Sequence, residues 1–305
     1  MKRANHILVG TDFSKAADQA LHRAVALARR YHSKLTVLHV IDQLPTDSRW
    51  MLFGVPPTDI AEALRKRGEE ELEKRKELFE GIAVELDVRF DKPSHAIVQA
   101  ATERGCGLIV IGRTGESALE RLLVGSTAER VLRTAPQMVL VVGKKEGPWT
   151  RVVAPIDFSA SSKDSLKLAG VLARGEGASL DVLHAYEYAG LAQIASATAI
   201  STTTTFQQEI EDQARRELDK SIEEAELEGL SVERHLRVGL AAEEICALAE
   251  EVDADLIVMG SVGRSGFKRL LLGNTAERVV RQTAASLLTV KPAEETERLA
   301  KEITA

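Results

Sequence analysis

Ile7-Leu8-Val9-Gly10-Thr11-Asp12-Phe13-Ser14 joins a short apolar run to a polar turn, and it returns 145 residues later (157 minus 12) as Val152-Val153-Ala154-Pro155-Ile156-Asp157-Phe158-Ser159. The match continues downstream, because Leu35-Thr36-Val37-Leu38-His39-Val40 is answered by Leu180-Asp181-Val182-Leu183-His184-Ala185. Further on, Gly125-Ser126-Thr127-Ala128-Glu129-Arg130-Val131 is answered by Gly273-Asn274-Thr275-Ala276-Glu277-Arg278-Val279. The chain therefore contains two copies of one domain.

Short apolar runs alternate with helical patterns in both copies, and the runs rich in Val, Ile and Leu are typical of parallel strands buried on both faces. The predicted strands are 6–10, 35–41, 84–90, 108–112 and 138–142, and then 151–156, 180–186, 231–237, 255–260 and 287–290. The predicted helices are 14–31, 60–79, 95–103 and 126–134, and then 160–174, 206–229, 241–251 and 274–283. This alternation predicts an α/β fold of two tandem doubly wound domains, each a five-stranded parallel sheet flanked by helices.

We predict domains at 1–145 and 149–293, followed by a charged C-terminal tail at 294–305. The link 143–148 is short and polar, so the domains are expected to pack closely. Their last strands could pair within one polypeptide and bury two sheet edges, which would make an intramolecular pseudo-dimer; a homodimer of whole chains stays open. The segment 189–205 has no charged residue and is interpreted as a loop or lid, with a weak helical extension as the alternative.

The composition excludes several classes of protein. A net charge of −6 argues against a general affinity for nucleic acid or for an anionic membrane. No apolar run approaches the roughly 20 residues that span a bilayer, and the N-terminus does not resemble a signal peptide, so we expect a cytoplasmic protein. The two cysteines, Cys106 and Cys246, lie in different copies without a CxxC pattern, which supports neither a disulfide framework nor a cysteine metal site.

Glycines cluster where the fourth predicted strand of each copy ends. Gly112-Arg113-Thr114-Gly115 is followed, after nine residues, by Gly125-Ser126-Thr127. Gly260-Ser261-Val262-Gly263 is followed, after nine residues, by Gly273-Asn274-Thr275. Glycine lets the backbone approach a ligand closely, and the free N–H groups at the start of the next helix point at a bound anion. The pattern predicts a phosphate-binding loop in each copy.

Asp12 and Asp157 end the first strands and should face the same crevice, because ligands of open α/β sheets bind at the carboxyl ends of the strands. A carboxylate there suits ribose hydroxyls or a ligand amine, and the backbone at Val40 and Ala185 would form a wall for a base. Each aspartate could instead cap the following helix. His39 and His184 are interpreted as hydrogen-bonded core residues rather than as catalytic or metal-binding groups.

These residues resemble the universal stress protein family, specifically its tandem-domain members, over nearly the whole chain. ATP-binding members show Gly, two residues, Gly, nine residues, Gly, and then Ser or Thr. The positions that match are Gly112, Gly115, Gly125 and Ser126 in copy one and Gly260, Gly263 and Gly273 in copy two, where Asn274 departs from the pattern. The resemblance implies a Rossmann-like, adenine nucleotide alpha hydrolase-like fold that binds ATP, with an accompanying Mg²⁺ or Mn²⁺ left open.

By this resemblance, adenine and ribose would lie near Asp12 and Val40, and the phosphates on the glycine loop and Ser126; Asp157 and Ala185 would be the counterparts in copy two. The copies differ at the position after the second glycine, which is Glu116 in copy one and Arg264 in copy two. They also differ at Asn274, so we expect both sites to be competent but unequal in affinity.

The leading functional hypothesis is a nucleotide-responsive regulatory or stress-resistance module, in which ATP orders the glycine loop and changes a surface read by an unknown protein partner. One alternative is a slow metal-dependent ATPase, at most weak because the sequence has no Walker-type loop and no evident general base. Another is that one domain binds a non-nucleotide ligand or serves as a scaffold. No catalytic residue and no metal ligand is proposed from the sequence.

Overall fold

The computed structural model describes residues 5–42, 57–114, 124–187, 203–261 and 272–291. The chain divides between Lys144 and Lys145 into two compact units, here unit 1 and unit 2. The predictions made for Gly115, Gly263, residues 189–202 and the tail 294–305 lie outside the described residues. Pairing of the two units through their last strands stays a prediction.

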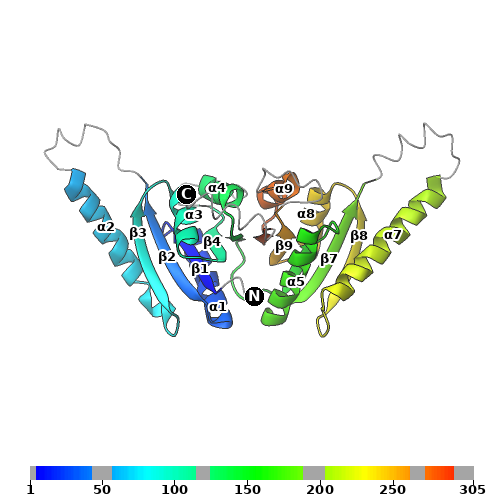
Figure 1. Cartoon of the computed structure of the whole chain (residues 1–305), viewed down its shortest axis with the longest axis horizontal. Helices are drawn as coiled ribbons and strands as arrows, with labels where there is room; N and C mark the ends of the chain where they lie inside the picture. The colour runs from blue at the N-terminus through cyan, green and yellow to red at the C-terminus, as the bar shows by residue number, and fades with distance from the viewer. Residues whose placement is uncertain (1–4, 43–56, 115–123, 188–202, 262–271, 292–305) are drawn as a thin grey trace. The chain divides into compact units, whose positions relative to one another are not determined.

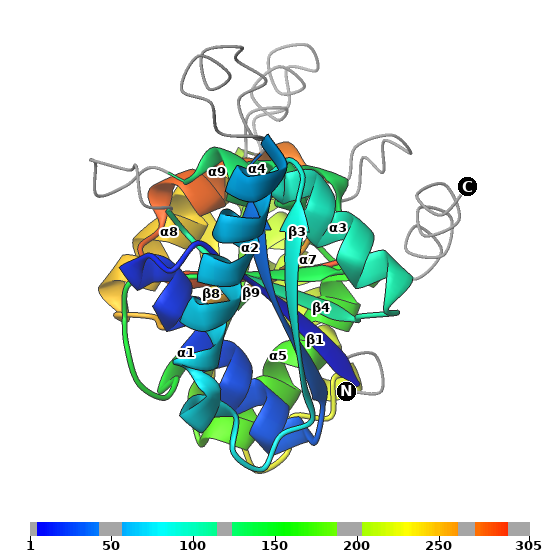
Figure 2. The same cartoon turned by 90° about the vertical axis from the view of Figure 1, so that its left-hand side faces the viewer.

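In unit 1, strands and helices alternate along the sequence. They are β1 His6–Thr11, α1 Lys15–Tyr31, β2 Lys34–Ile41, α2 Pro57–Glu73, the 3-10 helix η2 Lys76–Phe79, β3 Val84–Phe90, α3 Pro93–Glu103, β4 Leu108–Gly112, α4 Ser126–Thr134 and β5 Met138–Val142. The strands pair in parallel in the order β3-β2-β1-β4-β5. Right-handed crossovers place α1 and α2 on one face of the sheet and α3 on the other, as Figure 2 shows.

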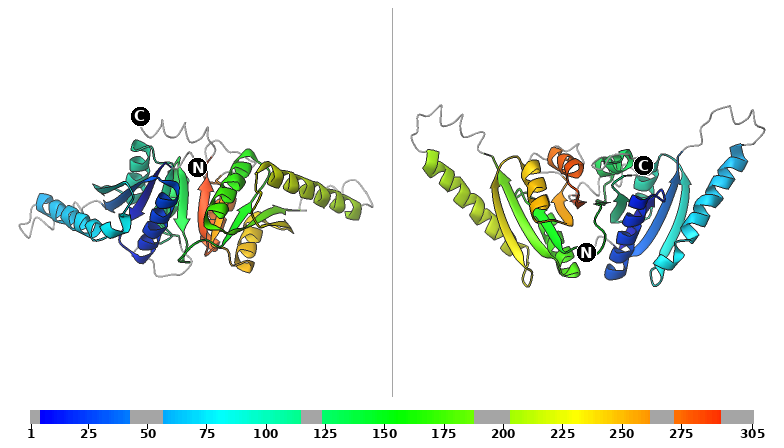
Figure 3. Two further views of the ribbon diagram at one scale, coloured as in Figure 1. Left: turned by 90° about the horizontal axis from the view of Figure 1, so that it is seen from below. Right: turned by 180° about the vertical axis from the view of Figure 1, so that it is seen from behind.

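Unit 2 repeats this arrangement. Its elements are β6 Arg151–Pro155, α5 Ala160–Glu176, β7 Ser179–Tyr186, α7 Thr203–Glu224, β8 Val232–Val238, α8 Ala241–Glu251, β9 Leu256–Gly260, α9 Asn274–Gln282 and β10 Ser286–Val290. The strands pair in parallel in the order β8-β7-β6-β9-β10. In Figure 1 and in the reverse view of Figure 3, α7 lies beside β8 as α2 lies beside β3. The predicted α/β fold with parallel sheets flanked by helices is confirmed.

The core explains why these segments fold as they do. Ile7, Leu8 and Val9 of β1 are fully buried, as expected for a strand covered by helices on both faces. In α1, an apolar stripe at helical spacing faces the sheet, including Ala20, Leu21 and Ala24, which are 0% exposed. No helix among the described residues combines the length and apolar character needed to cross a membrane.

Two predicted helices differ from the structure by more than two residues at an end. The helix predicted to reach Phe79 ends at Glu73, and a 3-10 turn then brings the Phe79 side chain into the core at 6% exposure. The helix predicted at 206–229 begins at Thr203, so the last residues of the segment interpreted as a loop are helical. It ends at Glu224, and beyond this end Leu227 lies so close to Gly170 that a side chain on residue 170 would not fit.

Candidate functional site

Each unit has a pocket at the carboxyl ends of its strands, at the point where the strand order reverses. In unit 1 this point lies between β1 and β4, and in unit 2 it lies between β6 and β9. The cavity volumes are about 370 Å³ in unit 1 and about 500 Å³ in unit 2, within the range of small-molecule sites. Open α/β sheets bind their ligands at this topological switch point.

The two pockets bring together every described residue that the sequence predicts for the site. The unit 1 pocket is lined by Asp12, Val40, Gly112, Gly125, Ser126 and Thr127, among others. The unit 2 pocket is lined by Asp157, Ala185, Gly260, Gly273, Asn274 and Thr275, among others. Residues far apart in sequence therefore converge on one cavity in each unit.

The loop between the fourth strand and the next helix is closed by the same hydrogen bond in both units. The Gly125 N–H donates to the Arg113 carbonyl over 2.7 Å, and the Gly273 N–H donates to the Ser261 carbonyl over 2.6 Å. Gly125 and Gly273 are the N-cap residues of α4 and α9, and neither helix has a side-chain cap bond. Within the part of the chain that the structure describes, no side chain accepts from the first N–H groups of either helix, and such groups favour an anion.

The strand-end aspartates do not cap the following helices. The caps are Ser14, whose Oγ accepts from the Ala17 N–H over 3.2 Å, and Ser159 in unit 2. Asp12 Oδ1 accepts instead from the Ser14 N–H over 3.1 Å, and Asp157 Oδ1 accepts from the Ser159 N–H over 3.0 Å. The capping interpretation of the two aspartates is wrong, and both carboxylates line pockets.

The residue after each aspartate has a left-handed backbone. Phe13 has φ of 64° and Phe158 has φ of 65°, which costs a bulky residue about 1–3 kcal/mol. Each phenylalanine ring packs against a histidine near the end of the second strand of its unit, with centroids 4.3 Å apart for His39 of β2 and 4.1 Å apart for His184 of β7. Strain of this kind persists only where neighbours hold it, and it is found at ligand sites.

His39 and His184 are structural residues in both units. His39 Nδ1 lies 2.9 Å from the Thr11 carbonyl oxygen, and His184 Nδ1 lies 2.8 Å from the Ile156 carbonyl oxygen. Each bond ties the second strand to the end of the first. The predicted hydrogen bonds are confirmed for both histidines, and His184 is buried in the core, whereas His39 is only half-buried.

Sequence reasoning missed two kinds of lining residue. Arg113 lies inside the glycine motif and lines the unit 1 pocket at 4% exposure, while Ser261 takes that position in unit 2. Ile97 of α3 lines the unit 1 pocket, and Ile245 of α8 lines the unit 2 pocket, so each adds an apolar side chain to the lining. The position of Arg113 within the motif was the signal available; the isoleucines have no signal beyond helical periodicity.

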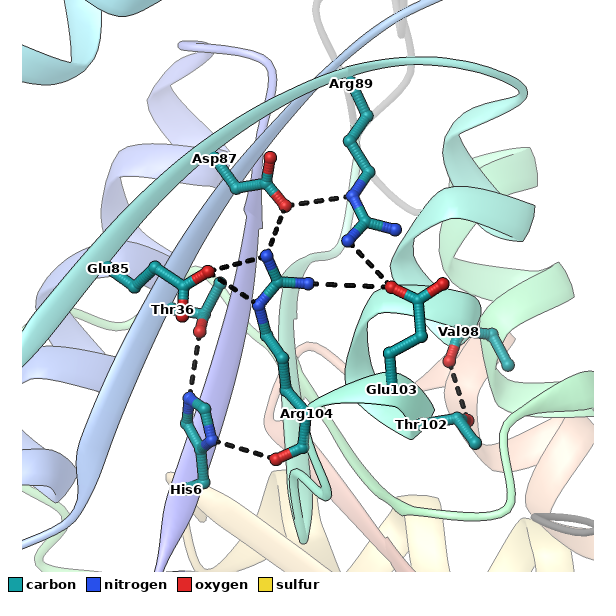
Figure 4. A network of polar contacts seen from close by, with 9 residues as sticks. All are labelled: His6, Thr36, Glu85, Asp87, Arg89, Val98, Thr102, Glu103 and Arg104. Carbon is teal, nitrogen blue, oxygen red and sulfur yellow. Dashed lines mark hydrogen bonds and ion pairs between the residues drawn. The ribbon is translucent and has the colours of Figure 1, made fainter. Parts of the chain in front are cut away.

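A polar network lies at the other end of the unit 1 sheet, beside the start of β1 (Figure 4). Arg104, just after α3, donates from Nη2 to Glu85 Oε1 over 2.6 Å and to Asp87 Oδ2 over 2.7 Å. Its carbonyl oxygen lies 3.2 Å from His6 Nδ1, and His6 Nε2 lies 2.9 Å from Thr36 Oγ1. This network joins α3 to three strands and is separate from the pocket.

At the equivalent end of its sheet, unit 2 has a buried charged residue where unit 1 has a threonine. Asp181, at the register position of Thr36, is fully buried; it accepts from Arg151 Nε over 2.7 Å and from His235 Nε2 over 2.7 Å. Burial alone would raise the pKa of the Asp181 carboxyl, but the hydrogen bonds from Arg151 and His235 outweigh burial and hold that pKa below its ordinary value.

Asp181, Glu233 and His235 offer possible metal-ligand atoms within 4.8 Å of one another. The Arg151 guanidinium already lies against both carboxylates, 2.7 Å from Asp181 and 3.4 Å from Glu233. The arginine supplies the positive charge that a metal ion would bring, so we interpret this group as an ion network.

Comparison with known proteins places the chain. The pattern of the universal stress protein family matches residues 4–143 and again residues 148–291, which together cover most of the chain. The chain belongs to the universal stress protein family. It carries two universal stress protein domains in tandem, as the sequence resemblance implied.

The relatives include a protein that matches a single domain copy and a protein that matches both copies. A universal stress protein of Methanocaldococcus jannaschii is 34% identical over 145 residues, which are 45% of this chain and 81% of the relative. A universal stress protein of Mycolicibacterium smegmatis is 27% identical over 297 residues, covering 94% of this chain and 97% of the relative. The crystal structure of a universal stress protein from Archaeoglobus fulgidus has the same fold, with a TM-score of 0.64 at 23% identity, covering 94% of this chain and 98% of that one.

Proposed function

We propose that each unit binds an adenine nucleotide, ATP in the first place, and that the protein acts in the cytoplasm as a nucleotide-responsive regulatory or stress-resistance module. One observation carries this proposal: in each pocket the aspartate that follows the first strand lines the same cavity as the start of a helix that has no side-chain cap among the described residues. A nucleotide needs both kinds of partner, because its ribose hydroxyls donate to a carboxylate and its phosphates accept from the N–H groups at a helix start.

In unit 1, the phosphates would lie on the N–H groups that open α4, where the helix dipole and the hydroxyls of Ser126 and Thr127 favour an anion. Asp12 would accept from the ribose hydroxyls, and the base would lie against Val40. Gly115 would complete the loop. A Mg²⁺ or Mn²⁺ ion would enter with the phosphates rather than through protein ligands.

In unit 2, Asp157 and Ala185 would take the ribose and base roles, and Asn274 and Thr275 at the start of α9 would meet the phosphates with Gly263 in the loop. The Asn274 amide can donate to a phosphate but has no hydroxyl. The cavity is larger by about 130 Å³ (about 500 minus about 370), and Ser261 replaces Arg113 in its lining. These differences support unequal affinities, with tighter binding in unit 1.

Replacing each strand-end aspartate separates the two sites. Asp12→Ala should weaken ATP binding to unit 1 about tenfold, because a charge-assisted hydrogen bond contributes roughly 1.5–3 kcal/mol. Asp157→Ala should do the same to unit 2. Isothermal titration of ATP should then resolve one weakened and one unchanged site in each variant.

The matched control is Asp164→Ala, which removes an exposed carboxylate on α5 away from the pocket lining and should leave both affinities unchanged. Identical remaining isotherms in the Asp12→Ala and Asp157→Ala proteins would refute the inequality of the sites. Failure of the unchanged protein to bind any adenine nucleotide would refute the proposed function itself.

Mass spectrometry of small molecules released from the purified protein tests the ligand class directly. Retained ATP, without phosphate release when Mg²⁺ or Mn²⁺ is added, is the result expected of a binding module. Steady phosphate release that Asp12→Ala and Asp157→Ala abolish would identify an ATPase instead. Release of a different compound would reassign the pocket.

A further inference from the structure

The turn that carries Asp12 is contacted from outside the pocket by a guanidinium group. Arg75 follows the end of α2, and its Cζ lies 4.9 Å from the centroid of the Phe13 ring. Its Nε and Nη2 donate to the two carboxylate oxygens of Asp18, in the first turn of α1, over 3.0 and 3.4 Å. Its Nη1 donates to the Glu71 backbone oxygen over 2.9 Å. One side chain therefore joins the end of α2 to Phe13, the neighbour of Asp12, and to the first turn of α1.

This contact bears on Asp12 because Phe13 is its neighbour and has the left-handed backbone described above. A non-glycine residue keeps such a backbone only when its surroundings hold it there. The Phe13 ring is held by two contacts, with His39 and with the Arg75 cation, which is attracted to the face of an aromatic ring. The Arg75 side chain is only 19% exposed, so water weakens the attraction less than at an open surface.

Unit 2 builds the same turn without an arginine at this position. Phe158 has the same left-handed backbone. Arg75 comes three residues after the buried Leu72, and the residue three positions after the equivalent Leu218 is Ser221. Ser221 is buried, and its Oγ donates to a carbonyl of its own helix. Where unit 1 has Asp18, unit 2 has Lys163, which pairs with Glu224 over 2.8 Å. The helix pair is thus linked in both units, through Arg75 and Asp18 in unit 1 and through Lys163 and Glu224 in unit 2.

We propose that Arg75 is a positioning residue for the ligand of unit 1: through Phe13 it fixes the Asp12 turn, and it couples occupancy of the pocket to the docking of α2 against α1. The proposal rests on the nucleotide-binding function proposed above. Coupling is reciprocal, so a ligand that needs the fixed turn must also stabilise the contact between Arg75 and Asp18.

The test uses the full chain carrying Asp157→Ala, which weakens binding to unit 2 so that the titration reports on unit 1, and adds Arg75→Met. Methionine keeps an unbranched side chain but removes the charge. We expect the Kd for ATP to rise about threefold to tenfold, as follows from the usual strength of a partly buried cation–ring contact. Arg75→Lys, which retains the cation, should give a smaller rise.

The matched control is Arg29→Met. Arg29 also ties α1 to the segment after α2, through its Nη2 donating to the Leu78 and Glu80 carbonyls over 2.9 and 3.3 Å, but among the described residues it makes no cation–ring contact with Phe13. It should lower stability without changing the Kd. As a second measurement, ATP should protect amides of residues 70–79 from hydrogen exchange in the parent and not in Arg75→Met.

An unchanged Kd in Arg75→Met, or an equal rise in Arg29→Met, would overturn the positioning role while leaving the proposed function intact. If the unmodified protein binds ATP but the Asp157→Ala parent does not, unit 1 has no site and the inference is also wrong. Absence of ATP binding in the unmodified protein would instead remove the proposed function and this inference together.

Discussion

Asp181→Ala is expected to destabilise unit 2 by about 3–5 kcal/mol, the cost of removing one partner from a buried ion pair. Asp181 is 0% exposed, and its carboxylate is the shared acceptor of Arg151 and His235. Alanine would leave the guanidinium and the ring facing a cavity without an acceptor. Because the two units need not unfold together, hydrogen exchange of peptides from β6 to β8 is the measurement that reports on unit 2 by itself.

Thr36→Val is the matched control, since Thr36 holds the same register position in unit 1 and its Oγ1 lies 2.9 Å from His6 Nε2. Only a neutral hydrogen bond is lost there, so the expected cost is about 1 kcal/mol. Costs of equal size in the two units would show that the charge of Asp181 adds nothing to the hydrogen bond.

The same carboxylate predicts a dependence on pH. Its folded-state pKa is lowered, so its contribution to stability is complete above the unfolded pKa of about 3.9 and is lost as the pH falls through the folded pKa. The stability difference between the unmodified protein and Asp181→Asn should therefore be constant from about pH 6 to about pH 5 and shrink below about pH 4. A difference that grows on acidification would contradict the lowered pKa.

Gly112→Ala is expected to cost about 3 kcal/mol and to disturb the unit 1 pocket, because overpacking a tight contact forces the backbone to move. A Cβ on Gly112 would lie 2.7 Å from the backbone carbon and oxygen of Ala16, in the first turn of α1. The first glycine of the motif is thus required for helix packing as well as for its place in the pocket lining. Urea unfolding and ATP titration of the variant should both show the loss.

Gly260→Ala provides the comparison within the same chain. There the nearest atom is the Ser161 Oγ at 2.6 Å, and the nearest backbone atom is 3.4 Å away. A hydroxyl can rotate aside, so the cost should fall to about 1 kcal/mol, and adding Ser161→Ala should reduce it further. Equal costs at Gly112 and Gly260 would show that the contact with the Ala16 backbone is not the cause.

Much of the fold is predictable from short-range pattern. The predicted strand 84–90 coincides with β3, and the predicted helix 126–134 coincides with α4, because burial on one or two faces gives a periodicity that is readable locally. Helix ends were harder to predict. Just beyond the end of α7, Leu227 packs against Gly170, a contact across more than fifty residues that no local window contains.

Some residues of the candidate site could likewise be predicted from local sequence, and others could not. Asp12, Gly125 and Ser126 were predictable because strand ends and glycine spacing recur in both copies. That Ser14 rather than Asp12 caps α1 was not, since both residue types favour the cap and only backbone geometry distinguishes them. The role of Arg75 was hidden in a charged helix face, where an arginine beside an aromatic ring cannot be told from a solvated one.

The sequence by itself determined that this protein is a duplicated α/β domain of the universal stress protein family with one crevice in each copy, because a repeat and its hydrophobic periodicity are local properties of the chain. Only the tertiary structure decided that Gly112 packs on α1, that Arg75 contacts Phe13, and that unit 2 buries Asp181 where unit 1 has Thr36. These features depend on atoms brought together from distant segments, and their energies come from burial and close approach.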